Sequence, residues 1–382
     1  MHLPDVSRRD LLAGIAGIGI SGIANAKPAP ASAVAIARCK TYDRNLAPTV
    51  SRLMDQIGGI GPLVKNKTVA IKLNLTGKPT RYPVDPELPY RNNPDMVLAT
   101  MQVLAKAGAK RIRILESFFP ASQDMELWAR YGFDIAAMNN VGCKVEWENI
   151  QNLGKGTKYT RVKVPWGGYM FPAYDLNHSL LDCDTYMTIP KLKNHWIAGV
   201  TMSLKNSFGI TPCSLYGGDC GPSGNENPTQ ERGPVCHSGT TPPPKGVAAE
   251  LHPDTPRDPG YRVPRITADL NGCRPVDLAI VDGVDSIRGG EGAWNPGVQL
   301  IRPGVLIAGK NAVCVDAVCM AAMGYDPKSD RGTKPFIRGD NTLKLAEAVG
   351  IGTTDLERIE VAGLTIKEAF CDYGPGAIGK RI

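Results

Sequence analysis

The sequence lacks the short motifs that identify the commonest nucleotide-binding and hydrolytic sites. It contains no G-x-x-x-x-G-K-[ST] phosphate loop, no H-E-x-x-H and no G-x-S-x-G, and no G-x-G-x-x-G follows its first predicted strand. These absences exclude a Walker-type phosphate site and disfavour serine-hydrolase chemistry. Histidine is also scarce, with five residues in 382, which argues against a multi-histidine metal centre.

Ten cysteines are present, but no two of them have C-x-x-C spacing. Zinc-ribbon and ferredoxin-type spacings are therefore absent, and an iron–sulfur cluster is not expected. Cys213, Cys220 and Cys236 share one Gly/Pro-rich stretch, where disulfides are expected in an oxidising compartment. A metal site formed by these cysteines with His237 is the alternative.

The sequence also lacks a concentrated basic tract, although its net charge is +7. Its basic residues are scattered among acids, which favours a small anionic partner and disfavours nucleic acid. Beyond the N-terminal segment no apolar run approaches membrane-spanning length, so no stable membrane span is expected there.

The N-terminal segment 1–26 has the features of a secretory signal. Arg8 and Arg9 precede a mild, Gly/Ala-rich apolar stretch, and an A-x-A cleavage site follows at 24–26. The paired arginines resemble a twin-arginine (Tat) signal, which predicts export by the Tat translocase to the periplasm or another extracytoplasmic location. The alternative is an N-terminal membrane anchor that is never cleaved.

Short β-branched runs alternate with helical patterns, which predicts an α/β fold that forms a single domain over residues 34–382. We expect a mostly parallel sheet flanked by helices, with a β-α-β unit over 69–117. Residues 150–176 are expected to form a hairpin. The Gly/Pro-rich, cysteine-containing stretch 211–262 is expected to be a long insertion, either a lid, a binding element or a disordered arm. The expected strands are 69–75, 111–117, 144–149, 185–191, 277–283, 304–310 and 358–363, and the expected helices are 93–110, 124–139, 196–208, 311–323 and 341–349.

Polar residues lie at the carboxyl ends of several predicted strands, including Lys310 and Asn311 at the end of the strand predicted over 304–310. Ligands of open parallel sheets bind beyond those ends, so the side chains are expected to line one cleft. Clustered lysines repel one another, which lowers their pKa values unless acids or an anionic ligand are present. The N–H groups of a helix that begins near Trp196 would add to the attraction for an anion. We expect anion binding by Lys72, Asn74, Lys191, Lys205 and Asn206.

Other residues at these ends suit chemistry rather than binding. A lysine with a lowered pKa can act as a base or form a Schiff base. The cofactor is unknown, and an oxygen-rich site for a divalent metal is one option. Structural roles stay open for many of these residues, such as a turn-forming role for Asp282, and they stay open for Asp269 and Asp316 as well. The candidates for catalysis are His195, Glu116 and Lys193, and those for the metal are Asp282, Glu291 and Asp316.

The segment PKLKNHWIAGVTMSLKNSFG (190–209) resembles the motif of domain-of-unknown-function family 362, in which P-K-x-K-x-H precedes a helix that ends L-K-N-x-x-G. The segments VAIKLNL, RPVDLAIVDGVDSIRGGEG and IAGKNAVCVDAVCMAAMGYDP extend the resemblance over 68–327. Members of the family occur alone or joined to iron–sulfur ferredoxin modules, and the family implies no named activity. The ferredoxin spacing is missing here, which puts an electron-transfer role in doubt. Carried over by position, the motif residues are Lys72, Asn74, Glu116, Lys191, Lys193, His195, Lys205, Asn206, Asp282, Glu291, Asn311 and Asp316.

These patterns predict an exported enzyme that acts on a small carboxylate or phosphate in a lysine-rich cleft. The alternative is a non-catalytic periplasmic protein that holds a ligand or cofactor in the same cleft. A redox partner that uses the cysteines is least favoured, because the C-x-x-C spacing is absent.

Overall fold

The computed structural model describes residues 28–43, 45–77, 88–118, 125–151 and 159–377. The predicted Tat signal at 1–26 lies outside these ranges. Within them, no helix has both the length and the apolar character needed to cross a bilayer.

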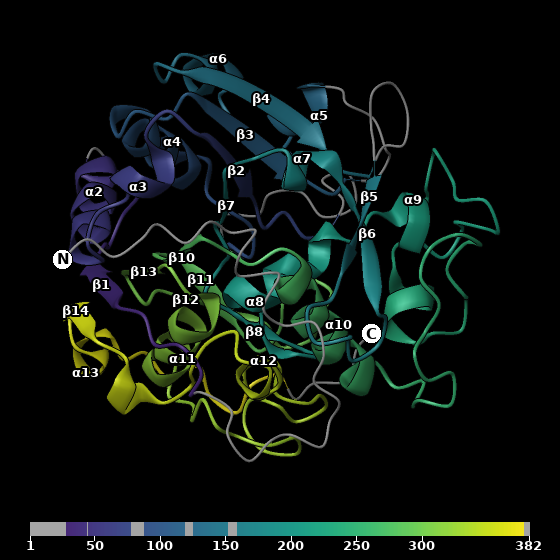
Figure 1. Cartoon of the computed structure of the whole chain (residues 1–382). Coiled ribbons are helices and arrows are strands. Elements are labelled where there is room, and N and C mark those ends of the chain that lie inside the picture. Colours follow the sequence, from purple (N-terminus) through teal and green to yellow (C-terminus); the bar gives the residue numbers. More distant parts are fainter. Residues whose placement is uncertain (1–27, 44, 78–87, 119–124, 152–158, 378–382) are drawn as a thin grey trace, which may run out of the picture.

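An eight-stranded sheet runs through the centre of the described structure (Figure 1). Its neighbouring strands are parallel, except that β13 is antiparallel to both β1 and β10. This arrangement confirms the predicted α/β fold with a mostly parallel sheet. In spatial order the strands are β14 (Val361–Gly363), β1 (Val34–Arg38), β13 (Val305–Gly309), β10 (Leu278–Gly283), β7 (Thr185–Thr188), β2 (Thr68–Lys72), β3 (Arg111–Glu116) and β4 (Lys144–Asn149).

Helices cover both faces of this sheet, so its strands are apolar on both sides. In β2, Val69 and Ile71 pack into one core, and Ala70 between them packs into the other. The first core includes α2 (Leu46–Gln56), α3 (Gly61–Val64), α4 (Pro94–Lys106), α5 (Met125–Ala129) and α6 (Ile135–Asn139). The second includes α7 (His178–Leu181), α8 (Met202–Asn206), α9 (Cys213–Tyr216), α10 (Pro259–Cys273), α11 (Ala312–Ala322), α12 (Thr342–Ala348) and α13 (Ile366–Ala369).

The predicted β-α-β unit is present as β2, α4 and β3, with the two strands paired in parallel. Asn93 precedes α4, and its side-chain oxygen accepts a hydrogen bond from the Asp95 N–H at 2.8 Å. Pro94 occupies the first helical position, where its missing N–H costs nothing. The local start signals in the sequence therefore act as expected.

The predicted helix over 196–208 is wrong at its start. Asn194–His195 (β8) and Gly199–Val200 (β9) form a small hairpin, and α8 begins only at Met202 and passes into a 3-10 turn, η2 (Ser207–Ile210). Gly199 has a φ of 72°, and a Cβ added there would lie 2.6 Å from the Phe336 ring. A helix cannot continue through a residue in that conformation.

The predicted helix over 124–139 is two short helices, α5 and α6. Gly132 lies between them with a φ of 84°, which ends the first helix. Asp134 then starts the second, because its side chain accepts a hydrogen bond from the Ala137 N–H at 2.9 Å.

The insertion is shorter than 211–262, because α10 begins at Pro259. Asp258 caps this helix through the Gly260 N–H at 3.1 Å, and Pro264 lies inside it. A proline within the helix is the reason that the sequence pattern missed it. The remaining insertion holds α9 and a π-helical turn, η3 (Gly233–His237).

Other small elements complete the described structure. The predicted hairpin within 150–176 is confirmed as the antiparallel pair β5 and β6. Their bounds and those of the remaining elements are β5 (Tyr159–Lys163), β6 (Ala173–Asn177), β11 (Ser286–Arg288), β12 (Gln299–Ile301) and a 3-10 turn, η4 (Leu356–Arg358).

All ten cysteines are free thiols in the structure. This contradicts the expectation that Cys213, Cys220 and Cys236 form disulfides. All three thiols are buried, and burial raises the pKa of each of them. His237 contacts a ring instead, with its centroid 5.2 Å from that of Phe208.

Candidate functional site

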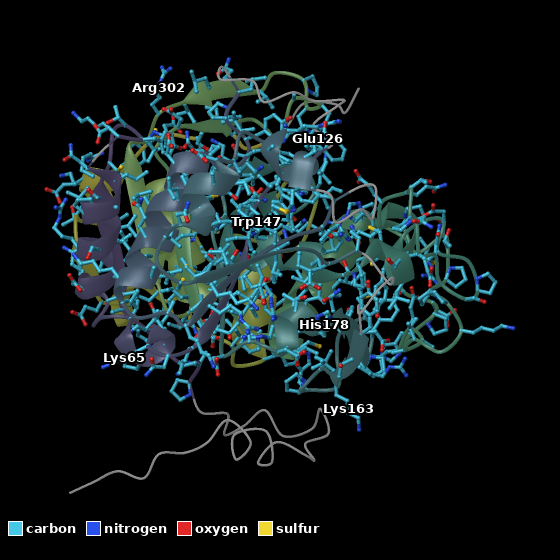
Figure 2. All side chains as sticks on the ribbon, turned by 90° about the horizontal axis from the view of Figure 1, so that it is seen from above. Lys65, Glu126, Trp147, Lys163, His178 and Arg302 are labelled. Carbon is cyan, nitrogen blue, oxygen red and sulfur yellow. The ribbon has the colours of Figure 1, made fainter. Side chains whose placement is uncertain are left out.

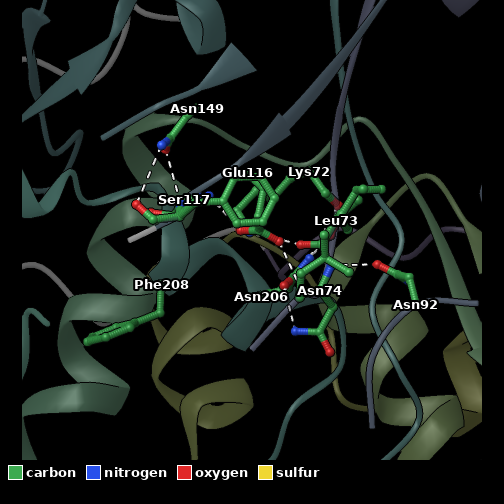
Figure 3. Close-up of polar contacts among 12 residues, drawn as sticks. Lys72, Leu73, Asn74, Asn92, Glu116, Ser117, Asn149, Asn206 and Phe208 are labelled. Carbon is green, nitrogen blue, oxygen red and sulfur yellow. Dashed lines mark hydrogen bonds and ion pairs between the residues drawn. The ribbon is translucent and has the colours of Figure 1, made fainter. Parts of the chain in front are cut away.

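The carboxyl ends of β2 and β3 carry a buried ion pair between Lys72 and Glu116 (Figure 3). Their side chains are 3% and 5% exposed. The Lys72 ammonium also donates to the Leu73 carbonyl at 2.8 Å, and Glu116 accepts hydrogen bonds from the N–H groups of Leu75 and Ser117 at 3.0 and 2.8 Å. Burial lowers the pKa of Lys72, while the adjacent Glu116 carboxylate opposes that shift.

A chain of amide side chains joins the same strand ends to α8 (Figure 3). Asn74 donates from Nδ2 to Asn206 Oδ1 at 3.1 Å, and Asn206 donates to Thr188 Oγ1 at 2.6 Å. These bonds fix the end of α8 over β2 and β7. Asn74 Oδ1 is buried and has no hydrogen-bond partner in the described part of the chain.

A cavity of about 140 Å³ opens between these strand ends, α8 and the insertion. It brings together four of the residues expected to bind an anion and two of those expected to transfer protons. His195 lies in its wall. The charged residues that line it are Lys72, Lys205, Arg232, Glu116, Glu231 and Glu291. The positive and negative groups are balanced in number.

Lys205 differs from its neighbours in having no oxygen partner. Its Nζ lies 4.3 Å from the centroid of the Phe208 ring and makes no hydrogen bond or ion pair with any described residue. Burial lowers its pKa to about 7; Glu291 opposes the shift, and the positive charges of Arg232 and Lys72 add to it. At neutral pH the amine is therefore a mixture of charged and uncharged forms.

His195 lies in the cavity wall with its Nδ1 already occupied. The backbone N–H groups of Ile197 and Ala198 both donate to this nitrogen at 3.2 Å. Because Nδ1 accepts hydrogen bonds, the neutral ring carries its proton on Nε2.

Glu291 takes the place expected for a bound anion next to the small hairpin. Its carboxylate accepts hydrogen bonds from the Trp196 N–H at 2.8 Å and from the Trp294 indole N–H at 3.0 Å. The first N–H groups of α8 are also occupied, since those of Ser203 and Leu204 both donate to Asp316 at 2.8 Å. The expectation that this helix start holds an anion is therefore wrong.

Arg232, like its neighbour Glu231, is one of the cavity residues that the sequence did not point to. It comes from the insertion and donates from Nη2 to Ser117 Oγ at 2.6 Å and from Nε to the Thr211 carbonyl at 2.9 Å. The first bond joins the insertion to the end of β3. No local signal distinguishes this arginine from other basic residues, because its role depends on a contact across 115 residues.

Residues 69–321 match the family model described as "Domain of unknown function (DUF362)". The chain belongs to the DUF362 family. Every cavity residue of this DUF362 protein lies inside the matched range. A comparison with curated proteins finds no match.

Among solved structures, this DUF362 protein is similar to one titled "Structure of the lactate racemase apoprotein from Thermoanaerobacterium thermosaccharolyticum". The sequence identity is 12% and the TM-score 0.36, and the match covers 65% of this chain. The chain spans about half the length of that protein, with 50% of it covered.

Two predicted site lysines of the DUF362 protein lie outside the cavity lining. The Lys191 ammonium donates to Asp282 Oδ2 at 3.0 Å, to the Tyr42 hydroxyl at 3.1 Å and to the Asp285 carbonyl at 2.5 Å. These oxygens satisfy all three of its donors. The expected anion-binding role of Lys191 is therefore not supported, because its charge is already neutralised.

Lys193 is also buried away from the cavity. It donates to the backbone carbonyls of Tyr90 and Glu291 at 2.5 and 3.0 Å. Burial lowers its pKa well below the usual range, with the Lys191 and Arg91 charges adding to the shift. Lys193 does not line the cavity, so its expected catalytic role is not supported by this arrangement.

The three carboxylates expected to bind a divalent metal have separate partners. Asp282 accepts from the Tyr42 hydroxyl at 2.8 Å and pairs with Lys191, whereas Glu291 and Asp316 are bound by N–H groups. Across the residues that the structure describes, no group of three or more His, Cys, Asp or Glu side chains is placed to hold a metal ion. The described structure therefore does not bring these three carboxylates together as a metal site.

The reversed direction of β13 accounts for a further correction. Val305 pairs with Gly283 and Gly309 with Ala279, so the carboxyl end of β13 lies beside the amino end of β10. Lys310 and Asn311 thus lie at the other ends of the strands, away from the cavity. There Asn311 caps α11 by accepting hydrogen bonds from the N–H groups of Val313 and Cys314.

Asp269 has a structural role in the DUF362 protein. It accepts hydrogen bonds from the N–H groups of Tyr169 and Met170 at 2.7 and 2.9 Å and from the Tyr174 hydroxyl at 3.0 Å. These bonds tie the β5–β6 hairpin to α10. Burial raises the pKa of Asp269 to about 6.

Proposed function

We propose that this DUF362 protein is an enzyme that binds a small carboxylate or phosphate in the cavity around Lys205. The observation that carries this proposal is that the Lys205 amine makes no hydrogen bond or ion pair with a described residue, whereas Lys72, Lys191 and Lys193 all contact oxygens. An anion in the cavity supplies the missing acceptor. Arg232 adds a second positive group from the insertion.

Proton transfer in this proposal belongs to groups of the same wall. Lys205, with a pKa of about 7, can both accept and release a proton near neutral pH. His195 carries a proton on Nε2, since Nδ1 is an acceptor. Glu116 has both carboxylate oxygens engaged, so its role is to hold Lys72 in place.

Anion binding is tested by calorimetric titration of the full chain with inorganic phosphate, oxalate and pyruvate. We expect Lys205→Met to weaken binding of the preferred anion about tenfold to a hundredfold, because a charge-assisted hydrogen bond contributes roughly 1.5–3 kcal/mol. The matched control is Lys163→Met, which removes an exposed lysine at the periphery (Figure 2) and should leave affinity unchanged. Equal affinity of the Lys205→Met variant and the unsubstituted protein would contradict the proposal.

If the protein only binds the anion, the calorimetric titrations give the same result but the bound molecule is not converted. This alternative is distinguished by His195→Gln: in an enzyme this variant retains anion affinity but loses conversion of the bound molecule. Conversion of pyruvate, whose methyl hydrogens can exchange, is followed by the incorporation of solvent deuterium, measured by proton NMR.

We also propose that the protein is exported by the Tat route. The proposal rests on Arg8, Arg9 and the apolar stretch that follows them. Replacing both arginines by lysine should retain the protein in the cytoplasmic fraction, as measured by immunoblotting of fractionated cells. Export of that variant at the level of the unsubstituted protein would contradict the proposal.

A further inference from the structure

We propose that Lys205 forms a covalent imine with a small carbonyl-bearing carboxylate of the 2-oxo acid class, bound in the cavity. This inference rests on the proposed anion site and specifies its substrate class. It also assigns to Lys205 a bond-forming role in place of a purely electrostatic one.

The first argument is the surroundings of the Lys205 nitrogen. Ammonium groups in protein interiors are held by oxygens, as two buried lysines of this protein illustrate, with Lys72 on Glu116 and Lys191 on Asp282, whereas Lys205 is partly buried. Lys205 instead has the Phe208 ring face at 4.3 Å. With no oxygen of the described chain to stabilise its charged form, this amine loses its proton more readily, and the neutral amine has the lone pair that attacks a carbonyl carbon.

The second argument is the rigid support of Lys205. Its helix α8 is held at the start by Asp316, which accepts the N–H groups of Ser203 and Leu204. At the end of α8, Asn206 is bonded to Thr188 and Asn74. A nucleophile on a backbone fixed at both ends presents its reactive atom in one place, which favours reaction with a bound partner.

The third argument is the distribution of charge around the amine. Arg232 and Lys72 disfavour a positive charge on Lys205, whereas Glu291 and Glu231 favour it. Burial dominates, and the resulting pKa of about 7 leaves a substantial fraction of uncharged amine at neutral pH. Arg232 also provides a positive group that can bind the carboxylate next to the substrate carbonyl.

The step balances without an added oxidant or reductant. The Lys205 ammonium first releases one proton, and the amine nitrogen then attacks the carbonyl carbon to form a C–N bond. The carbonyl oxygen is protonated and leaves as water when the C–O bond breaks. Of the three hydrogens of the original ammonium, two depart with this water and one remains on the iminium nitrogen, so the positive charge is conserved.

The test is reductive trapping of the full-length protein. Purified protein is incubated with pyruvate or 2-oxoglutarate and sodium cyanoborohydride, and the modified position is determined by peptide mass spectrometry. We expect one reduced adduct per chain, on Lys205, which forms faster as the pH rises through about 7. Adducts spread over exposed lysines such as Lys163, with formation rising only at higher pH, would overturn the proposal.

Lys205→Arg separates this inference from the proposed function. Arginine retains a positive charge but cannot form the imine, so this variant should still bind pyruvate in the calorimetric titration and yield no adduct. Lys163→Arg is the matched control and should trap normally. If the unsubstituted protein binds the 2-oxo acids but traps none of them, the imine is refuted and anion binding stands. If it binds no anion, the proposed function fails as well.

Discussion

At the scale of single residues, the buried and partly buried lysines of this protein differ in what surrounds each ammonium group. Lys72 has a carboxylate, Lys193 has carbonyls, and Lys205 has an aromatic ring. The sequence identified all three, because lysine within an apolar run is unusual. It could not assign their roles, since the oxygens that hold Lys72 and Lys193 come from Glu116, 44 residues away, and Tyr90, 103 residues away.

The Lys72–Glu116 pair makes a prediction at this scale. Glu116→Gln leaves the Lys72 ammonium buried without its counter-charge, so we expect the free energy of unfolding to fall by about 3 kcal/mol. Urea denaturation at pH 7 measures the change. The double variant Lys72→Met, Glu116→Gln buries no charge and should recover most of the loss. If the double variant is no more stable than Glu116→Gln, the ion pair with Lys72 is not the reason that Glu116 stabilises the fold.

At the scale of elements, α8 is a five-residue helix that carries two cavity residues, Lys205 and Asn206. The C-terminal part of the predicted helix over 196–208 is confirmed, because Lys205 and Asn206 do end it. Its start could not be predicted from local signals. Gly199 has a positive φ, and its missing Cβ leaves room for the Phe336 ring, which is 137 residues distant in the chain and invisible to periodicity.

Asp316, which caps α8, predicts a pH dependence of stability. Burial raises its pKa to about 7, from about 3.9 in an unfolded chain. Between these values the folded protein retains a proton that the unfolded chain has lost, so the contribution of Asp316 to stability falls as pH rises from about 4 to 7. Asp316→Asn removes that slope.

The measurement is a set of urea denaturation curves for both proteins across this pH range. We expect the stability of the unsubstituted protein, relative to the Asp316→Asn variant, to decline toward pH 7. Taking the difference cancels other titrating groups, including Asp269. Parallel stability curves would contradict the raised pKa of Asp316.

At the scale of the whole molecule, the sequence predicted the layers and most strands of the sheet. It did not predict that β13 runs against its neighbours, because a strand buried on both faces has the same apolar pattern in either direction. This one reversal moved Lys310 and Asn311 away from the cavity. Arg232 was missed for the related reason that the insertion has no periodicity that could place it.

The ten free thiols make a prediction for the whole chain. Unfolding in denaturant without reductant should release ten thiols per chain to a thiol-reactive dye, whereas the folded protein should react mainly at Cys143, Cys183 and Cys371, which are partly exposed. Burial raises the pKa of Cys236 to about 12, so its reaction in the folded state should be slow. A shortfall of two thiols after unfolding would reveal a disulfide in the isolated protein.

The bond between Arg232 and Ser117 has a consequence for how this protein family can diversify. The floor of the cavity belongs to the sheet, where a change of length would disturb strand pairing. The wall that carries Arg232 belongs to a segment with little regular structure, where insertions and deletions are tolerated. Selection can therefore exchange the wall that carries Arg232 while Lys205 and its helix stay in place, so that, under the proposed function, new specificities evolve beside an unchanged lysine.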